Sequence, residues 1–307
     1  MEVNSSERFR GCLLGLATGD AVGTIVEFQR RGSFSPVIDM VGGGPFNLKP
    51  GQWTDDTSMA LCLGTSLVEV GEFDQIDQMN RYCNWYEHGY LSSTGNCFDI
   101  GNTVSQALQK YKISGNPFSG STNPMSAGNG CLMRLAPIPM FYFPNRDRIL
   151  HFSGESSRTT HGAAECIDAS RLFGDILFHT LSGTSKTDIL FRNEVDINNL
   201  EIITSPSIQS IARGDYQSKS VDDVRGTGYV VESLEAALWC FWTTETYQQA
   251  ILAATNLGDD ADTTAAICGQ VAGAYYGESG IPAHWLRQLV MRDEITELAD
   301  QLHNHIP

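Results

Sequence analysis

The stretch ERFRGCLLGLATGDAV, residues 7–22, combines an apolar helical pattern with glycines at Gly11, Gly15 and Gly19. A spacing of four residues puts these glycines on one side of a helix, where the missing side chains let another backbone come close. Residues 262–277 have a face of small residues. Its members are Ala265, Ala266, Gly269, Ala272 and Gly273. We expect such a helix at the centre of a bundle, with its neighbours packed tightly against it.

Helical patterns also dominate the rest of the chain. A Thr/Asp cap precedes a buried apolar helix over residues 54–70. The other helices predicted are 74–88, 99–112, 161–181, 230–242 and 245–255. β-rich segments are brief, as at 201–204, and no strand–helix alternation indicates a parallel sheet. No linker or shift in composition marks a boundary, so the sequence predicts a compact all-α bundle, one domain spanning residues 1–307, without coiled-coil heptads.

Composition and charge narrow the class of partner and the compartment. The chain has 307 residues and a net charge of −16, which argues against nucleic acids and acidic membranes as partners. A small phosphate-bearing ligand stays possible, since backbone N–H groups and metal can hold it. The eight cysteines form no C-x-x-C pair, which is typical of free thiols in a reducing compartment. Residues 1–10 lack a signal-peptide core, so we expect a cytoplasmic protein.

Two short acidic clusters about two hundred residues apart suggest the halves of one metal site. They are Thr54-Asp55-Asp56-Thr57 and Asp259-Asp260-Ala261-Asp262-Thr263-Thr264. Carboxylate and hydroxyl oxygens suit Mg²⁺, Mn²⁺ or Ca²⁺ better than zinc or copper. Either cluster alone could simply cap a helix, but two clusters with adjacent hydroxyls are more than capping needs. If they meet, their charge requires one cation and favours two. An EF-hand is excluded, because its glycine position holds Ala265.

Two further acids lie in glycine-rich surroundings. Glu27 follows Gly23, and Asp99 is flanked by Phe98 and Ile100. An acid between apolar neighbours can have a raised pKa, which suits general acid–base catalysis. The alternative for each is a loop acid that caps the following helix.

Three other positions are candidates for ligand contacts. His161 lies near a helix start, where a histidine is either a hydrogen-bonded structural residue or a functional group. Asn129-Gly130 predicts a turn with an amide that could face a ligand. Tyr229 follows a glycine-rich loop, and its ring could stack on a base or staple the next helix.

In order and spacing, these motifs resemble the ADP-ribosylglycohydrolase family. The motifs are Gly15-x4-Asp20-Ala21-x-Gly23-x3-Glu27, Thr54-Asp55-Asp56-Thr57, Gly128-Asn129-Gly130-x2-Met133-Arg134, Thr160-His161 and Gly258-Asp259-Asp260-Ala261-Asp262-Thr263. The resemblance runs from about Gly11 to Trp285 and is weak across 183–220. Residues 98–101 (FDIG), 228–231 (GYVV) and 234–239 (LEAALW) look most like the dinitrogenase-reductase-activating branch.

The resemblance implies an all-α fold with a binuclear Mg²⁺ or Mn²⁺ centre. It also implies hydrolysis of the N-glycosidic bond between ADP-ribose and a protein side chain, arginine in this branch. The implied metal ligands are Thr54, Asp55, Asp56, Asp260, Asp262 and Thr263; the catalytic acids are Asp99 and Glu27; the ligand-binding residues are Asn129, Gly130, His161, Tyr229 and Asp20. One departure is Cys131, where many relatives have serine.

Other functions remain open on the sequence alone. The enzyme could act on another ADP-ribose linkage, such as serine or O-acetyl-ADP-ribose. A non-catalytic scaffold could bind ADP-ribose, or contact and block an ADP-ribosyltransferase through the polar stretch 183–227. A generic metal-dependent phosphohydrolase is disfavoured, because no Lys/Arg cluster accompanies the acids.

Overall fold

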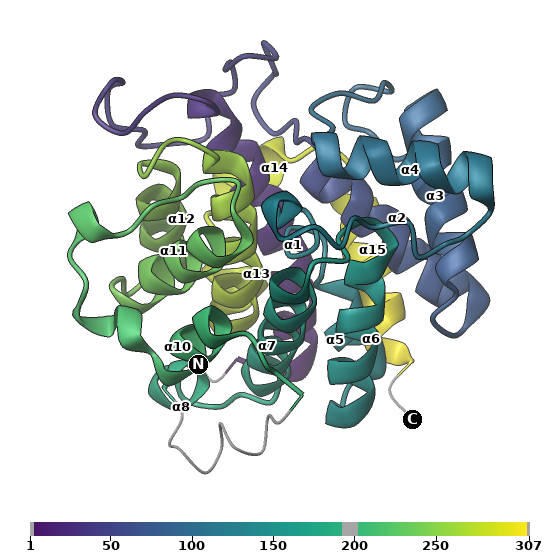
Figure 1. The fold of residues 1–307 in the computed structure, drawn as a ribbon. Helices are drawn as coiled ribbons and strands as arrows, with labels where there is room; N and C mark the ends of the chain where they lie inside the picture. The colour runs from purple at the N-terminus through teal and green to yellow at the C-terminus, as the bar shows by residue number, and fades with distance from the viewer. Residues whose placement is uncertain (1–2, 192–201, 306–307) are drawn as a thin grey trace.

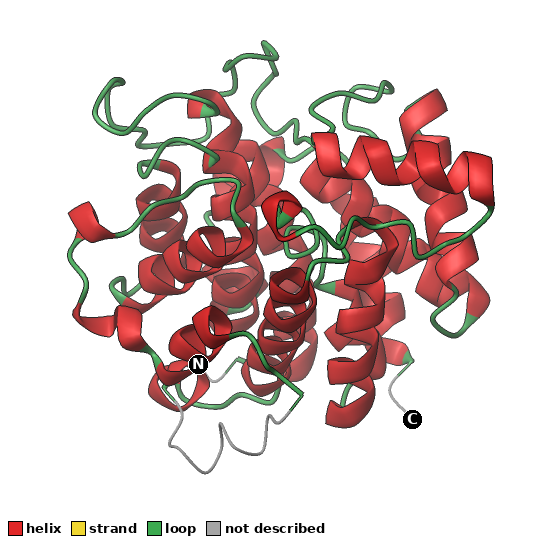
Figure 2. Cartoon of the chain, viewed as in Figure 1, coloured by secondary structure: helices red, strands yellow, loops and turns green. Residues whose placement is uncertain are grey.

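The computed structural model describes residues 3–191 and 202–305, and its regular structure is helical throughout (Figures 1 and 2). The α-helices are α1 (Ser5–Gly23), α2 (Asp55–Val70), α3 (Gln75–His88), α4 (Asn102–Ser114), α5 (Pro137–Tyr142), α6 (Arg146–Thr160), α7 (Ala164–Leu181), α8 (Lys186–Leu190), α10 (Pro206–Arg213), α11 (Val230–Trp242), α12 (Tyr247–Thr255), α13 (Ala261–Tyr276), α14 (Ala283–Gln288) and α15 (Arg292–Asn304). Within the described residues only isolated β-bridges occur, which confirms the all-α prediction.

The bundle is built around the contact between α1 and α13. A Cβ atom placed on Gly11 would overlap the carbonyl oxygen of Gly273, and one placed on Gly19 would overlap that of Ala265. The two backbones are therefore in direct contact along the glycine face, as residues 7–22 predict. Because the start of α1 lies beside the end of α13, the helices are antiparallel. The last turn of α1 consequently lies next to the first turn of α13, which carries the second acidic cluster.

The remaining helices cover this central pair. Helices α7, α11 and α12 pack on α13, and α15 packs on α1 and α2 (Figure 1). A smaller apolar cluster joins α2, α3 and α4 around Met59, Tyr82, Trp85 and Leu108. Residues 5–26 form a segment that is long and apolar enough, by length and composition alone, to cross a membrane. However, 89% of the 18-residue stretch that meets this test is buried inside the fold. The central position of α1 in the bundle therefore accounts for its hydropathy.

Two predicted helices begin later than expected, and in both a candidate site residue lies outside the helix. Asp99 has a left-handed φ of 61°, so α4 starts at Asn102 rather than at residue 99. His161 is extended, with φ −130° and ψ 96°, and forms a bridge with Ser121. The predicted helix 161–181 therefore begins only at Ala164.

Several helices were not predicted. Helix α6 buries Ser153, Gly154, Ser156 and Ser157, so its inner face lacks the apolar spacing that marks a helix. Part of the polar stretch 183–227, for which no helix was predicted, forms α8 and α10. Residues 202–204 form no strand, and the rest of the brief β-rich segment lies outside the described residues.

Candidate metal centre and ligand cleft

Asp20, in the last turns of α1, fixes the first acidic cluster in place. Its fully buried carboxylate accepts hydrogen bonds from Thr54 N (2.9 Å) and Oγ1 (2.9 Å) and from Thr57 N (3.1 Å) and Oγ1 (2.6 Å). These donors include backbone N–H groups at the start of α2, which have no partner within the helix. Asp20 therefore caps α2 and orients Asp55 and Asp56 in its first turn.

Glu27 does the same for the second cluster. Its Oε2 atom accepts from the backbone N–H groups of Ala261 (2.9 Å) and Asp262 (3.3 Å), in the first turn of α13. A backbone pairing strengthens this link, because Phe28 N donates to Asp259 O and Asp259 N donates to Gln29 O. The segment that ends α1 thus holds the N-termini of both acidic helices, and this arrangement brings the clusters together.

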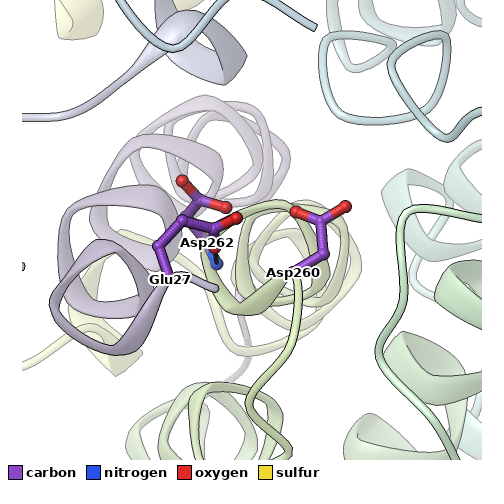
Figure 3. A group of neighbouring side chains, drawn as sticks. All are labelled: Glu27, Asp260 and Asp262. Carbon is purple, nitrogen blue, oxygen red and sulfur yellow. Dashed lines mark hydrogen bonds between the residues drawn. The ribbon is translucent and has the colours of Figure 1, made fainter. Parts of the chain in front are cut away.

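The two clusters meet in a cleft of about 760 Å³. Asp55 from the first cluster and Asp260, Asp262 and Thr263 from the second all line it. Thr263 Oγ1 lies 3.5 Å from Asp56 Oδ2, which links the clusters directly. Oxygen atoms of Glu27, Asp260 and Asp262 lie within 4.8 Å of one another. Figure 3 shows the carboxylates of Glu27 and Asp262 side by side, with that of Asp260 facing them.

This concentration of buried acids has a large electrostatic cost. Burial, followed by repulsion from Asp262 and other neighbouring carboxylates, raises the pKa of Asp55. Burial likewise raises the pKa of Asp56, with added repulsion from Asp20. Burial raises the pKa of Asp262 to about 7. The group cannot carry its full charge at neutral pH without a compensating cation.

The residues present fit divalent cations. Asp56 Oδ1 and Asp262 Oδ2 are buried and have no hydrogen-bond partner among the described residues. Buried carboxylate oxygens are normally paired or bound to metal, so these two atoms are expected to be ligands. The surrounding donors are carboxylate and threonine oxygens, the set that Mg²⁺ and Mn²⁺ accept. Thr54 already donates to Asp20 and is fully buried, but its Oγ1 keeps acceptor capacity.

Asp99 faces the same carboxylates from the loop before α4. It lines the cleft in a left-handed conformation that a non-glycine residue adopts infrequently. Burial, and then repulsion from Asp262 and Asp55, raise its pKa to about 11. In the metal-free protein Asp99 is therefore a protonated acid, the state in which it can donate to a leaving group.

The glycine-rich loop 128–130 forms the facing wall. Asn129 Nδ2 donates to Asp260 Oδ2 (2.7 Å) and to Ser233 Oγ (3.1 Å). The amide therefore orients a candidate metal ligand rather than pointing freely into the cleft. The ring of His161 lies against Gly128 and Gly130, and a Cβ atom on Gly130 would crowd it.

Two predicted ligand contacts lie elsewhere. Asp20 does not line the cleft, because α2 occupies its carboxylate, so the geometry gives it an organising position instead of a ligand contact. Tyr229 lies at the rim beside Gly228, 39% exposed, and its hydroxyl donates to Glu165 Oε2 (2.7 Å). Tyr229 itself does not line the cleft, although the neighbouring Gly228 does.

Among the cleft residues that sequence reasoning missed are Arg225 and Phe28. Arg225 lines the cleft and is the one cation of that lining in the described chain; its place in the glycine-rich loop 225–229 could have indicated it. Phe28 lines the mouth with its ring 68% exposed and a left-handed φ of 64°. Nothing in the local sequence predicts that conformation.

Comparison with known proteins agrees with this geometry. The family model for ADP-ribosylglycohydrolase matches residues 1–307. An ADP-ribosylarginine hydrolase Tri1 from Serratia proteamaculans is 42% identical over 100% of this chain and 81% of its own length. An ADP-ribosyl-[dinitrogen reductase] glycohydrolase from Rhodospirillum rubrum is 31% identical, covering 94% of this chain and 92% of its own. A solved structure described as an ADP-ribosylglycohydrolase-related protein complex superposes with a TM-score of 0.86 at 39% identity, covering 98% of each chain.

Proposed function

The chain belongs to the ADP-ribosylglycohydrolase family, and we propose that it is a divalent-metal-dependent hydrolase that releases ADP-ribose from modified arginine side chains. The observation that carries this proposal is the meeting of two distant acidic clusters in one cleft, with two buried carboxylate oxygens left without partners. The arginine linkage is supported by relatives whose names specify ADP-ribosylarginine, one of them from Pseudomonas putida at 43% identity.

The chemistry requires stabilised positive charge at the ribose and a protonated leaving group. Cleavage of the C1″–N bond gives the ribose oxocarbenium character, which nearby carboxylates stabilise. Asp99 lines the cleft, so it can donate a proton to the departing guanidine or hold the proton that the guanidine already carries. Glu27 keeps one oxygen free of the α13 cap and can orient the attacking water.

The resident cations are proposed to be Mg²⁺ or Mn²⁺, two in number. Asp55, Asp56, Asp260, Asp262, Thr54 and Thr263 would hold them. When bound, such cations lower the pKa of a water molecule and grip ribose hydroxyls. Asn129 supports this centre by holding Asp260, and Asp20 supports it by holding the first turn of α2.

The test uses an arginine-ADP-ribosylated protein as substrate. We expect the metal-saturated enzyme to release ADP-ribose, and Asp55→Ala and Asp260→Ala to lose at least 100-fold in kcat. Asp259→Ala is the matched control, since Asp259 lines the same cleft but is not a proposed ligand. Full activity in either ligand variant, or after thorough chelation, would refute the proposal.

Side-by-side assays on three ADP-ribose substrates test which linkage the enzyme prefers. Serine-linked ADP-ribose and O-acetyl-ADP-ribose should be cleaved more slowly than arginine-linked ADP-ribose. A protein that binds ADP-ribose by calorimetry but turns over none of the three would be a binding module instead.

Contact with an ADP-ribosyltransferase is a further proposal, and co-elution of the two purified proteins tests it. We also propose a cytoplasmic location, consistent with eight cysteines in the free state.

A further inference from the structure

His161 is held on its backbone and its ring by neighbouring residues. Its backbone N–H donates to Ser157 O (2.7 Å), and its carbonyl accepts from Ser157 Oγ (2.8 Å). On the ring, Nδ1 lies 2.8 Å from Thr160 Oγ1. The other ring nitrogen, Nε2, lies toward Gly128 and Gly130 of the cleft wall and has no hydrogen-bond partner among the described residues.

A buried arginine contacts the threonine that bonds to the ring of His161. Arg134 is fully buried, and its Nη2 donates to Thr160 Oγ1 at 2.6 Å. In the described part of the chain no carboxylate lies within 4 Å of its guanidinium; its other contacts are Ser156 O, Thr159 Oγ1, Met59 Sδ and the ring of Tyr82. An arginine can only donate hydrogen bonds, so Thr160 Oγ1 must accept from it.

Hydrogen-bond accounting then fixes the tautomer of the histidine. Thr160 is fully buried, and its hydroxyl has two partners, Arg134 and His161 Nδ1. Because Arg134 donates to the hydroxyl oxygen, the hydroxyl proton must be donated elsewhere. Among the described residues, His161 Nδ1 is the only acceptor within reach of it. If Nδ1 carried a proton instead, the buried hydroxyl proton would have no acceptor, which costs about 1–3 kcal/mol.

We infer that Arg134 and Thr160 are positioning residues, which hold His161 as a neutral imidazole whose Nε2–H points into the cleft as a fixed donor to an oxygen atom of ADP-ribose. Burial and the nearby Arg134 charge also lower the pKa of His161 to about 3, so the imidazolium form does not compete. The ligand oxygen thereby meets a directional donor rather than a mobile charge. The identity of the ligand rests on the proposed function, whereas the tautomer does not.

Nitrogen NMR on the full-length protein tests the tautomer directly. The seven histidines are labelled with ¹⁵N in the ring, and His161 is assigned from the signals lost in His161→Gln. We expect an unprotonated, hydrogen-bonded Nδ1 and a protonated Nε2 at neutral pH. A protonated Nδ1 would overturn the inference, whether or not the protein proves to be a hydrolase.

Substitutions at Thr160 test the positioning role. Thr160→Val removes the hydroxyl at nearly constant volume, and we expect the Nδ1 signal to move and the calorimetric Kd for ADP-ribose to rise roughly tenfold. Thr160→Ser should restore both. Thr180→Val is the matched control, because Thr180 is equally buried and its hydroxyl bonds only within α7.

Steady-state kinetics separate positioning from general damage. Loss of a ground-state contact raises KM and leaves kcat within a few-fold. A Thr160→Val protein with wild-type Nδ1 signal and wild-type Kd would contradict the inference. If the wild type binds ADP-ribose but releases none from any substrate, the proposed function fails, and a moved Nδ1 signal with a raised Kd in Thr160→Val still supports the positioning role.

Discussion

Asp20→Asn gives a sharp test of how the fold builds the site. The substitution keeps the shape of the side chain but replaces one carboxylate oxygen with an NH₂ group. That group would face either the Thr54 pair of donors or the Thr57 pair. The hydroxyl of that pair can turn away, but the backbone N–H at the start of α2 cannot.

The magnitude follows from these contacts. Thr54 N lies 2.9 Å from Oδ1 and 3.1 Å from Oδ2, so it keeps an acceptor in either orientation of the amide. Thr57 N meets Oδ2 alone and loses its acceptor if the NH₂ group takes that place, at about 1–3 kcal/mol, and the remaining hydrogen bonds lose the charge that strengthens them. We expect unfolding free energy to fall by about 2–4 kcal/mol. Because the first turn of α2 carries Asp55 and Asp56, Mn²⁺ affinity should also fall at least tenfold, which is about 1.4 kcal/mol.

Asp168→Asn is the matched control. Asp168 Oδ2 accepts from the backbone and hydroxyl groups of Thr204 and Ser205, the same donor chemistry at the start of α10. Urea unfolding should show a smaller loss of stability in Asp168→Asn, because its amide oxygen can accept from all four donors, and Mn²⁺ calorimetry should show weakened binding only in Asp20→Asn. If Asp20→Asn binds Mn²⁺ as the wild type does, the proposed role of Asp20 in shaping the metal site is wrong.

Three further outcomes are expected. Gly19→Ala should destabilise by about 3 kcal/mol or more in urea unfolding, since its Cβ would overlap a backbone carbonyl of α13; Gly64→Ala, whose Cβ meets only side-chain atoms, should cost much less, and equal losses would contradict the close helix contact. Asp99→Asn should lower kcat about 100-fold or more with ADP-ribose affinity nearly unchanged, and near-normal turnover would remove Asp99 from catalysis. Metal-free protein should lose stability as pH rises from about 4 to 7, because folding raises the pKa of Asp262 from 3.8 to about 7 and the folded state holds the proton longer. Taken alone, this pKa shift corresponds to a loss of at most about 4 kcal/mol in unfolding free energy. Saturating Mg²⁺ should abolish the pH dependence when urea unfolding is measured at a series of pH values. A stability that increases with pH would contradict the repulsion between the buried carboxylates.

Local patterns account for what the sequence could predict. The glycine face of α1 and the capped acidic starts of α2 and α13 are short-range signals, so these three helices were predicted within a few residues. The residues Ile295, Leu298, Ala299 and Leu302 of α15 show an equally plain helical spacing, and that signal could have found the helix.

The rest depends on contacts between distant segments. The sequence motif around Asp20 predicts a ligand contact. Only the position of α2 shows that the carboxylate of Asp20 already accepts hydrogen bonds from the start of that helix. The left-handed backbone of Phe28, Asp99 and Asp259 is imposed by the surrounding chain, because none of these residue types requires it. The pairing of Arg134 with Thr160 likewise exists only once α6 is folded.

The central claim is that the two acidic clusters form one divalent-metal centre. Anomalous diffraction from a crystal soaked in Mn²⁺ and ADP-ribose tests it most directly. Two anomalous peaks are predicted, bounded by Asp55 and Asp56 on one side and Asp260 and Asp262 on the other, with the ribose beside them. Manganese bound elsewhere, or a cleft that takes up ADP-ribose with no metal at these carboxylates, would contradict the account.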